Sequence, residues 1–313
     1  MATTRRIQYH EYGGPEVMRL EDFEPVRPGP GQVLVRVRAA AVNPLDWKIR
    51  NGTMKLMTGR SFPRAMGNDF AGVVEAVGEG VTRIRVGDEV LGGAQLKASG
   101  AFAEVVVAEE KAVVRKPEGL SFEEAAVLPT VGITAYQALF GKNRVRSGQA
   151  VFVHGCLGGV GRAATQLALA RGAVVGGSCR PASADVARDL GLSPVVGFDF
   201  DPRRLGERFD VVLDTAGTLP AKAARTMLTP GGRVVDITPT PAKFARSAVS
   251  ARYQVLIAQS VTGDLEEVAR AAGQGALRLP IARTVPLADA VDALAELELK
   301  GTPKGGKLVI TTG

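Results

Sequence analysis

Cysteine and histidine are scarce in this chain, whose 313 residues include two of each. The two cysteines, Cys156 and Cys179, cannot form a four-thiolate zinc site and give no reason to expect a disulfide framework, so the composition is typical of a reducing compartment. Because His10 and His154 are the only histidines, a histidine-rich metal site is excluded as well. Aromatic residues make up 5% of the chain, which leaves few side chains for base stacking and argues against binding to single-stranded nucleic acid.

Long apolar runs are missing too. No run approaches the ~20 residues that a helix needs to cross a bilayer. The opening stretch, MATTRRIQYH, carries two arginines without an apolar segment behind them, so it is not predicted to be a secretory signal. We therefore expect a cytoplasmic protein without a membrane partner.

The net charge of +7 is spread along the chain rather than concentrated. Several arginines alternate with valine, as Arg36 and Arg38 do in VLVRVRA, which predicts the solvent-facing side of a half-buried strand. We assign most of the positive charge to a solvated surface and part of it to the binding of an anionic, phosphorylated small ligand. A nucleic-acid partner is not expected.

The chain has the composition of a globular protein, with 45% hydrophobic and 23% charged residues, and its length suits two domains. Up to about residue 120, alternating Val, Ala and Ile runs are bounded by Gly, Pro and Asp, which predicts an antiparallel, partly closed β-domain. Ser121 and Glu124 then have the spacing of a helix capping box. Between residues 149 and 260, short apolar strands alternate with helical stretches, which predicts a parallel sheet covered on both faces. The last strand, GKLVITTG, is expected to rejoin the β-domain.

A glycine-rich loop lies between a predicted strand and a predicted helix, in VFVHGCLGGVGRAATQLALA. Its pattern is Gly155-x-x-Gly158-Gly159-x-Gly161, and a second apolar strand follows at the distance expected of a dinucleotide-binding unit. In that setting backbone N–H groups and a helix N-terminus face a diphosphate, and glycine lets the phosphate approach closely. The loop therefore predicts dinucleotide binding, with a simple tight turn as the alternative.

The end of the second strand indicates which dinucleotide is bound. An Asp or Glu there would hold the ribose 2′-hydroxyl of NAD, but the sequence reads Ser178, Cys179, Arg180, and the first acid is Asp185 in the next helix. Ser178, Arg180 and Ser183 would instead donate hydrogen bonds to a 2′-phosphate. We therefore predict NADPH as the cofactor in preference to NADH; the alternative is that these residues form a surface Arg-Pro turn.

Four blocks, in order, resemble the zinc-independent branch of the medium-chain dehydrogenase/reductase family, which contains quinone oxidoreductases, ζ-crystallin-like proteins and enone reductases. The blocks are YGGPEVMRLEDFEPVRPGPGQVLVRVRAAAVNPLDWKIRNG, MGNDFAGVVEAVGEGVTRIRVGDEVLGG, AAVLPTVGITAYQALF and VFVHGCLGGVG. The resemblance covers nearly the full length and implies an α/β fold of two domains. It implies a GroES-like, mostly antiparallel catalytic and substrate domain in residues 1–122 plus 276–313, and a Rossmann-type, doubly wound parallel-sheet domain in residues 123–275.

The same resemblance bears on metal and on assembly. Zinc-using relatives place a Cys and a His-Glu pair in two of these blocks, where this chain has Asn43, Asn68 and Asp69, so no metal site is expected. Relatives are often dimers that pair through the edges of their Rossmann sheets. We therefore expect a homodimer, with YQVLIAQS, residues 253–260, as the candidate edge strand.

The resemblance also implies residue roles. Asn43 is expected to position or contact the acceptor carbonyl, with an Asx turn before Pro44 as the alternative, and Lys48 to assist as donor, with a solvated lysine as the alternative. Asp46 is interpreted as a structural cap, and Trp47 and Met54 as walls of the substrate site or plain core. The catalytic candidates are Asn43, Lys48, Asn68 and Asp69, and the cofactor-binding candidates are Pro44, Thr134, Gly158, Gly159, Val160, Gly161, Ser178, Arg180, Ser183, Phe198, Ala216, Gly217, Ile237, Thr238 and Lys307.

Two side chains, Phe198 and Cys156, each have two possible interpretations. Phe198 falls either near the adenine or in the core at a strand end. Cys156, at a helix N-terminus, is interpreted as a small loop filler, with a lowered thiol pKa as the alternative.

The leading functional hypothesis is an NADPH-dependent reductase that transfers hydride, without zinc, to a quinone or to the C=C bond of an α,β-unsaturated carbonyl compound. In such acceptors the conjugated system spreads the incoming charge onto an oxygen that ordinary hydrogen bonds stabilise. A second hypothesis is a biosynthetic-pathway reductase or reductive cyclase that acts on an extended conjugated carbonyl compound. A third is a non-catalytic NADPH-binding regulatory protein.

Overall fold

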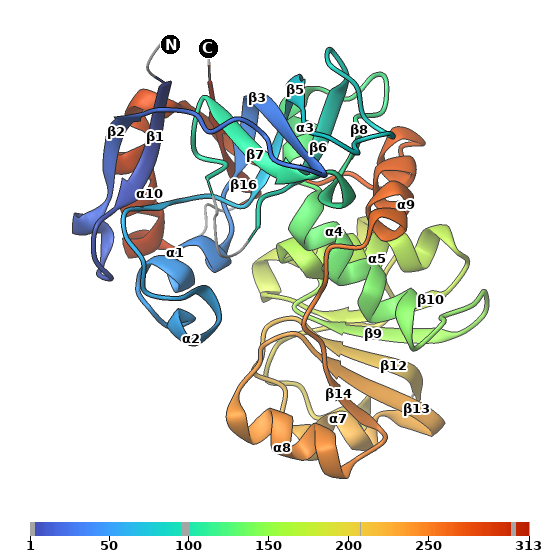
Figure 1. Ribbon diagram of the computed structural model, residues 1–313. Coiled ribbons are helices and arrows are strands. Elements are labelled where there is room, and N and C mark those ends of the chain that lie inside the picture. Colours follow the sequence, from blue (N-terminus) through green and yellow to red (C-terminus); the bar gives the residue numbers. More distant parts are fainter. Residues whose placement is uncertain (1–3, 96–99, 207, 302–304, 313) are drawn as a thin grey trace. The chain divides into compact units, whose positions relative to one another are not determined.

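The computed structural model describes residues 4–95, 100–206, 208–301 and 305–312 (Figure 1). The chain forms two compact units. Unit 1 is made of Met1–Thr130, Ser260–Gly273 and Leu279–Gly313, and unit 2 of Val131–Gln259 and Gln274–Arg278. Among the described residues, no helix has both the length and the apolar character required to cross a membrane.

The division differs from the predicted ranges, because residues 123–130 and 260–273 associate with unit 1 rather than with the Rossmann domain. The second stretch contains a helix that packs on β8, and the Thr262 hydroxyl donates to the carbonyl oxygen of Lys111 at 2.7 Å. Residues 274–278 belong to unit 2, where the Gln166 side chain bonds to the backbone of Arg278.

Unit 1 is built on a seven-stranded sheet with the order β15-β16-β3-β5-β6-β8, in which β7 pairs additionally with β3, and on a three-stranded sheet with the order β2-β1-β4. Apart from the parallel pair β15 and β16, the pairings are antiparallel. The strands are β1 (Thr4–Tyr9), β2 (Arg19–Phe23), β3 (Gln32–Ala41), β4 (Arg64–Ala65), β5 (Asp69–Val77), β6 (Glu89–Gly93), β7 (Val105–Glu109), β8 (Val113–Arg115), β15 (Ile281–Pro286) and β16 (Lys307–Thr311).

Strand β3 shows why this sequence forms a half-buried sheet. Its alternating Val33, Val35 and Val37 are at most 1% exposed, whereas Arg36 and Arg38 face solvent, as the valine–arginine alternation predicts. The last strand, β16, pairs antiparallel with β3, so its predicted return to the β-domain is confirmed.

The helices of unit 1 flank these sheets: α1 (Pro44–Arg50), α2 (Lys55–Thr58), α3 (Phe122–Ala126), α9 (Thr262–Gly273) and α10 (Ala290–Lys300). Helix α3 begins at the predicted capping box. The Ser121 hydroxyl accepts the N–H of Glu124 at 3.1 Å, and the Glu124 carboxylate accepts the N–H of Ser121 at 2.9 Å.

Unit 2 contains a six-stranded, entirely parallel sheet with the order β11-β10-β9-β12-β13-β14. Counted from β9, this is the order 3-2-1-4-5-6 of a doubly wound dinucleotide-binding sheet, in which the direction of winding reverses between β9 and β12. Ligands of such sheets bind beyond the carboxyl ends of the strands. The strands are β9 (Ala150–His154), β10 (Val174–Ser178), β11 (Val195–Val196), β12 (Phe209–Asp214), β13 (Leu228–Asp236) and β14 (Tyr253–Val255).

The helices of unit 2 are α4 (Pro129–Tyr136), whose first two residues still belong to unit 1, followed by α5 (Gly159–Ala170), α6 (Ala184–Asp189), α7 (Ala221–Thr226) and α8 (Pro241–Val249). Aromatic packing helps to close the core, since the Phe152 ring centroid lies 5.2 Å from those of both Phe200 and Phe209. Strand β14 is shorter than the predicted residues 253–260, and among the described strands it forms one edge of the sheet.

Candidate active site

Three neighbouring strands of unit 1 bring polar residues together at one place. Asn43 follows the end of β3, Asp69 begins β5, and Lys307 begins β16. The registers Ala41↔Asp69 and Val309↔Ala41 place these strand ends next to one another. Residues that are far apart in the sequence therefore form one cluster.

Asn43 is the centre of this cluster and is 2% exposed. Its side-chain amide donates to Asp69 Oδ2 at 2.9 Å and to the carbonyl oxygen of Ala41 at 3.3 Å, while its Oδ1 accepts from Lys307 Nζ at 2.5 Å. Both ends of the amide are thus engaged within the protein. This arrangement suits the predicted positioning role and not the predicted direct contact with an acceptor carbonyl, for which Asn43 has no free donor here.

Asp69 is 0% exposed, and its carboxylate is surrounded by donors. Besides Asn43, it accepts from the side-chain amide of Asn68 at 3.1 Å, from the backbone N–H of Thr130 at 3.1 Å and from the Thr130 hydroxyl at 2.6 Å. Thr130 also accepts from Asn68 at 3.0 Å. Sequence reasoning missed Thr130, which no local motif marks.

Asp46 is the predicted structural cap, and its Oδ2 accepts the backbone N–H of Asn43 at 2.7 Å. Burial raises the pKa of this carboxyl to about 7, and the charge of Asp69 adds to that effect, against the opposing influence of the Asn43 N–H and Lys307. Burial likewise lowers the pKa of Lys307, although Asp69 and Asp46 favour its charged form. The cluster therefore holds two carboxyl groups and one ammonium with little solvent.

The other predicted residues of this region lie on or near α1. Pro44 is the exposed first residue of the helix, and Lys48 is exposed. Trp47 packs against the core of unit 1, and Met54 is half-buried. The structure thus gathers Asn43, Asn68 and Asp69 and adds Lys307, whereas a role for Lys48 stays a prediction.

The glycine loop of unit 2 joins β9 to α5 as predicted. Gly155 has a φ of 85°, and the N–H groups of Gly155 and Cys156 both donate to the carbonyl oxygen of Ser178 on the neighbouring strand. A Cβ on Gly161 would lie 2.1 Å from the carbonyl oxygen of Gly155, so the helix lies directly against the loop and only glycine fits there. Gly158 and Gly159 are exposed, and Val160 is half-buried in the first turn.

The residues at this loop fit an anionic diphosphate. The first N–H groups of α5 have no partners within the helix, which favours an anion at its N-terminus. In the same turn, Nε of Arg162 is buried and has no hydrogen-bond partner among the described residues.

The His154 ring, 1% exposed, bridges two hydroxyl groups of unit 2. Its Nδ1 lies 2.7 Å from Ser178 Oγ and its Nε2 lies 2.9 Å from Thr218 Oγ1. Burial lowers the pKa of His154 to about 4, so the ring is neutral at neutral pH. Ser178 is 0% exposed and its hydroxyl is occupied by His154, and its contact with a 2′-phosphate stays a prediction.

Arg180, by contrast, is exposed directly after β10, and Ser183 is half-buried at the start of α6. Phe198 is 42% exposed and its ring meets the His154 ring edge to face at 5.0 Å, so it is not the buried core residue of the alternative interpretation. Its contact with adenine stays a prediction. Thr134 lies on α4 and is 9% exposed.

Cys156 is the small buried filler of the glycine loop. It is 0% exposed, and burial, with the nearby Cys179, raises the pKa of its thiol to about 12. The alternative of a lowered thiol pKa is therefore wrong: the helix N-terminus does not compensate for the loss of solvent.

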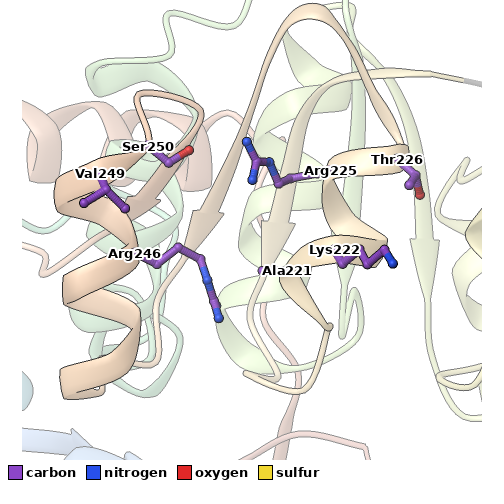
Figure 2. Close-up of a pocket in the computed structure, with 7 residues that line it drawn as sticks. All are labelled: Ala221, Lys222, Arg225, Thr226, Arg246, Val249 and Ser250. Carbon is purple, nitrogen blue, oxygen red and sulfur yellow. The ribbon is translucent and has the colours of Figure 1, made fainter.

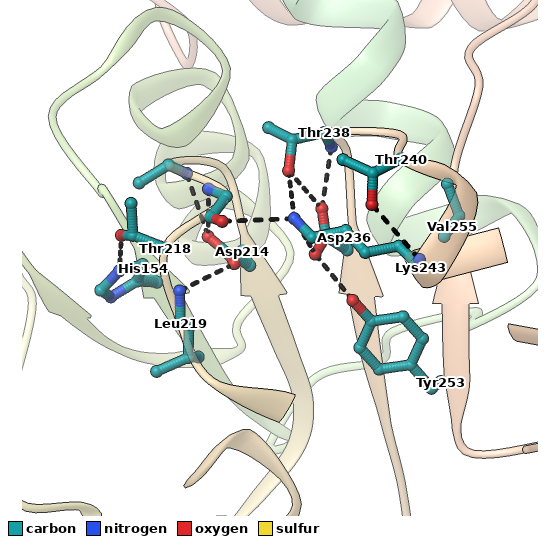
Figure 3. A network of polar contacts seen from close by, with 12 residues as sticks. His154, Asp214, Thr218, Leu219, Asp236, Thr238, Thr240, Lys243, Tyr253 and Val255 are labelled. Atoms are coloured by element: carbon teal, nitrogen blue, oxygen red, sulfur yellow. Dashed lines mark hydrogen bonds and ion pairs between the residues drawn. The ribbon is translucent and has the colours of Figure 1, made fainter. Parts of the chain in front are cut away.

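The remaining predicted cofactor residues follow β12 and β13. Ala216 and Gly217 form the turn after Asp214, whose Oδ1 accepts their N–H groups at 3.1 and 2.7 Å. Ile237 and Thr238 follow Asp236, whose Oδ1 accepts the N–H of Thr238 at 2.8 Å. Figure 3 shows that both turns belong to one polar network that also contains Lys243 and Tyr253, which sequence reasoning missed. An Asp closing each of two successive strands was the signal that could have found it.

Among the described residues, no three His, Cys, Asp or Glu side chains are grouped so that they could hold a metal ion. A pocket between α7 and α8 of unit 2 (Figure 2) is lined by residues that include none of the predicted site residues: Ala221, Lys222, Arg225, Thr226, Arg246, Val249 and Ser250.

The fold and these residues define a two-domain oxidoreductase of the type that uses a nicotinamide cofactor. Residues 29–118 match the family model of the alcohol dehydrogenase GroES-like domain, and residues 190–310 match that of a zinc-binding dehydrogenase. The chain belongs to the medium-chain dehydrogenase/reductase family.

The chain is 31% identical over 308 residues to the chloroplast envelope quinone oxidoreductase homolog of Arabidopsis thaliana, and 93% of each chain is covered. The structure of the quinone oxidoreductase from Coxiella burnetii superposes with a TM-score of 0.87 at 30% identity and covers 99% of both chains. The chain is also 38% identical over 234 residues to the pikromycin polyketide synthase component PikAII of Streptomyces venezuelae. This match covers 72% of this chain and 6% of the polyketide synthase component. These relatives favour an enzyme over the non-catalytic alternative.

Proposed function

We propose that this protein is an NADPH-dependent reductase that transfers hydride, without zinc, to a quinone or to the C=C bond of an α,β-unsaturated carbonyl compound. The cofactor preference is inferred from the residues at the end of β10. An acid that would hold a ribose 2′-hydroxyl is missing there, and an exposed Arg180 follows the strand. A guanidinium binds a 2′-phosphate by charge-assisted hydrogen bonds, whereas a carboxylate would repel it.

The test of the cofactor preference is calorimetric titration of NADPH and NADH into the wild type, Arg180→Ala and Arg188→Ala. Arg188 is the matched control, because it is an exposed arginine on α6 that pairs with Asp185. We expect the wild type to prefer NADPH and Arg180→Ala to bind it about 10- to 100-fold more weakly, with NADH binding and the control unchanged. Wild-type binding of NADH as tightly as NADPH would refute the proposal.

The absence of zinc chemistry is proposed from the chemistry of the side chains. Asn43, Asn68 and Asp69 stand where zinc-using relatives have stronger ligands, and the oxygens of Asp69 already accept from Asn43, Asn68 and Thr130. These residues do not fit a zinc ion. We expect the enzyme to keep its turnover after extended treatment with a chelator, once metal analysis has verified that zinc is absent. A loss of turnover that added zinc restores would contradict this part of the proposal.

The acceptor oxygen needs a donor when negative charge develops on it, and Lys307 is the residue that we assign to this task. One N–H of its ammonium donates to Asn43, and no other acceptor for it lies among the described residues, so two N–H groups can serve an acceptor oxygen. NADPH, when bound, supplies the hydride. The acceptor gains that hydride and one proton, so an enone becomes a saturated carbonyl compound and a quinone becomes a hydroquinone. Asn43 and Asp69 hold the lysine in place.

The assay follows NADPH oxidation with benzoquinone and methyl vinyl ketone. We expect turnover by the wild type and a kcat about 100- to 1,000-fold lower in Lys307→Met, the cost of one lost oxyanion donor. Lys300→Met is the control, because Lys300 is an exposed lysine of α10 that pairs with Glu296. Tight NADPH binding without turnover of any acceptor would contradict the proposal, and an unaffected Lys307→Met would remove the lysine from it.

A second candidate is a biosynthetic reductase of an extended conjugated carbonyl compound, with or without ring closure. The specific observation in its favour is the match to a polyketide synthase component. The same assay separates the two candidates when a sorbyl thioester, which carries a conjugated diene next to its carbonyl, is added to the acceptors. The second candidate predicts turnover of this extended thioester and poor turnover of simple quinones and enones.

A further inference from the structure

The turns that follow β12 and β13 are each shaped by a buried carboxylate. Asp214 and Asp236 are paired in the parallel register and are each 1% exposed. Asp214 accepts three backbone N–H groups of its own turn, the last from Leu219 at 3.1 Å. Asp236 Oδ1 accepts both the N–H and the hydroxyl of Thr238, at 2.8 and 2.6 Å. Each turn is therefore held by hydrogen bonds to its own carboxylate.

Lys243 joins the two turns (Figure 3). Its Nζ lies 2.7 Å from Asp236 Oδ2, and it donates to Thr238 Oγ1 at 2.6 Å and to the carbonyl oxygen of Gly217 at 3.2 Å. The three N–H groups of the ammonium thus have three acceptors, one on the first turn and two on the second. The backbone of Lys243 is held as well, because its N–H donates to the hydroxyl of Thr240, the N-cap residue of α8.

The electrostatics of the network make Lys243 difficult to replace. Burial raises the pKa of Asp236, but hydrogen bonds from Lys243, Thr238 and Tyr253 outweigh it and leave the pKa below its ordinary value. The Tyr253 hydroxyl donates to Asp236 Oδ2 at 2.8 Å, and burial, with the adjacent carboxylate, raises its pKa to about 12, so it remains a donor. Replacing Lys243 would remove from the buried carboxylate of Asp236 the ammonium that forms an ion pair with it.

We propose that Lys243 is a positioning residue that holds the Gly217 and Thr238 turns at a fixed separation for the nicotinamide half of the bound dinucleotide. The inference rests on the proposed function and on the prediction from the sequence that Gly217 and Thr238 bind the cofactor. It goes beyond that function because Lys243 reaches the cofactor only through Gly217, Thr238 and Asp236. The adenosine half of the dinucleotide, assigned to the β10 end of the sheet, does not depend on this link.

The test compares binding of the whole cofactor with binding of its adenosine half. NADPH and adenosine 2′,5′-bisphosphate are titrated into the wild type, Lys243→Met and Lys222→Met; Lys222 is an exposed lysine of α7 that lies outside the network. We expect Lys243→Met to bind NADPH about 10- to 100-fold more weakly while its affinity for the bisphosphate stays within about twofold. The control should match the wild type for both. Lys243→Arg, which keeps the charge beside Asp236, should lie between.

Equal weakening of both ligands, or no weakening of either, would overturn the positioning role. If Lys243→Met does not fold, Tyr253→Phe removes a single donor to Asp236 and should show the same selectivity at about three- to tenfold. If the wild type prefers NADH, the cofactor assignment fails. The positioning role is then judged by comparing the effect of Lys243→Met on the affinity for NADH with its effect on the affinity for adenosine 5′-monophosphate. If the wild type binds no dinucleotide, both fail.

Discussion

Replacing Asp46 with Asn should change how the stability of unit 1 depends on pH. In the folded protein the pKa of Asp46 rises from its ordinary value of 3.8 to about 7, mainly through burial. Folding therefore favours the protonated form, and the resulting stabilisation is complete below pH 3.8 and is lost as the pH rises through about 7. Integrating the difference in bound protons, we expect the wild type to lose about 2–3 kcal/mol between pH 5 and pH 8 through this group.

Urea unfolding provides the assay, because the chain carries its own reporter. Trp47, its single tryptophan, follows Asp46 on α1 and packs against the core of unit 1, so its fluorescence reports on the unfolding of the region in question. Wild type, Asp46→Asn and Asp22→Asn are compared from pH 5 to pH 8; Asp22 is an exposed aspartate of β2. Between pH 5 and pH 8, the free energy of unfolding of the wild type and of Asp22→Asn should fall by about 2–3 kcal/mol more than that of Asp46→Asn. Parallel curves for the wild type and Asp46→Asn would refute the reasoning.

Three further outcomes are expected. Gly161→Ala should destabilise unit 2 by about 1–3 kcal/mol in urea unfolding, because its Cβ would lie 2.1 Å from the carbonyl oxygen of Gly155, and it should also weaken NADPH binding; wild-type values would contradict the close contact. Cys156 and Cys179, both buried, should not react with iodoacetamide until the protein is unfolded, as mass spectrometry would show; rapid labelling of native protein would contradict this. The position of β14 at one end of the described sheet leads us to expect a dimer of twice the chain mass of 32.7 kDa in light scattering, and a monomer at micromolar concentration would rule it out.

Much of unit 2 was predictable because its signals are local. The strand, glycine loop and helix that contain Gly155 and Gly161 are consecutive in the sequence. The need for glycine is also local, because Gly155 has a φ of 85° and a Cβ on Gly161 would meet the carbonyl oxygen of Gly155. The capping box at Ser121 and Glu124 is local in the same way, and both its hydrogen bonds are present. The extent of β14 was not predictable, because the apolar run 253–260 does not itself show where pairing with β13 stops.

The electrostatic roles were harder to predict. Ser178 was predicted to donate to a phosphate because it ends the second strand, where an acid would hold a ribose 2′-hydroxyl, but its hydroxyl lies 2.7 Å from Nδ1 of His154 on the adjacent strand. For Cys156 the predicted role of a small loop filler is confirmed, because its complete burial outweighs the effect of the helix N-terminus, which would favour a thiolate.

The sequence by itself determined the two-domain class, the strand, glycine loop and helix of the first βα unit of unit 2, and the replacement of the acid after β10, since each depends on residue types at short spacings. Only the tertiary structure decided that Lys307 meets Asn43, 264 positions away, and that Lys243 binds the turn at Gly217 to the turn at Thr238. The physical reason is that a buried ammonium or carboxylate takes its role from whichever partners surround it, and strand pairing brings those partners from distant parts of the chain.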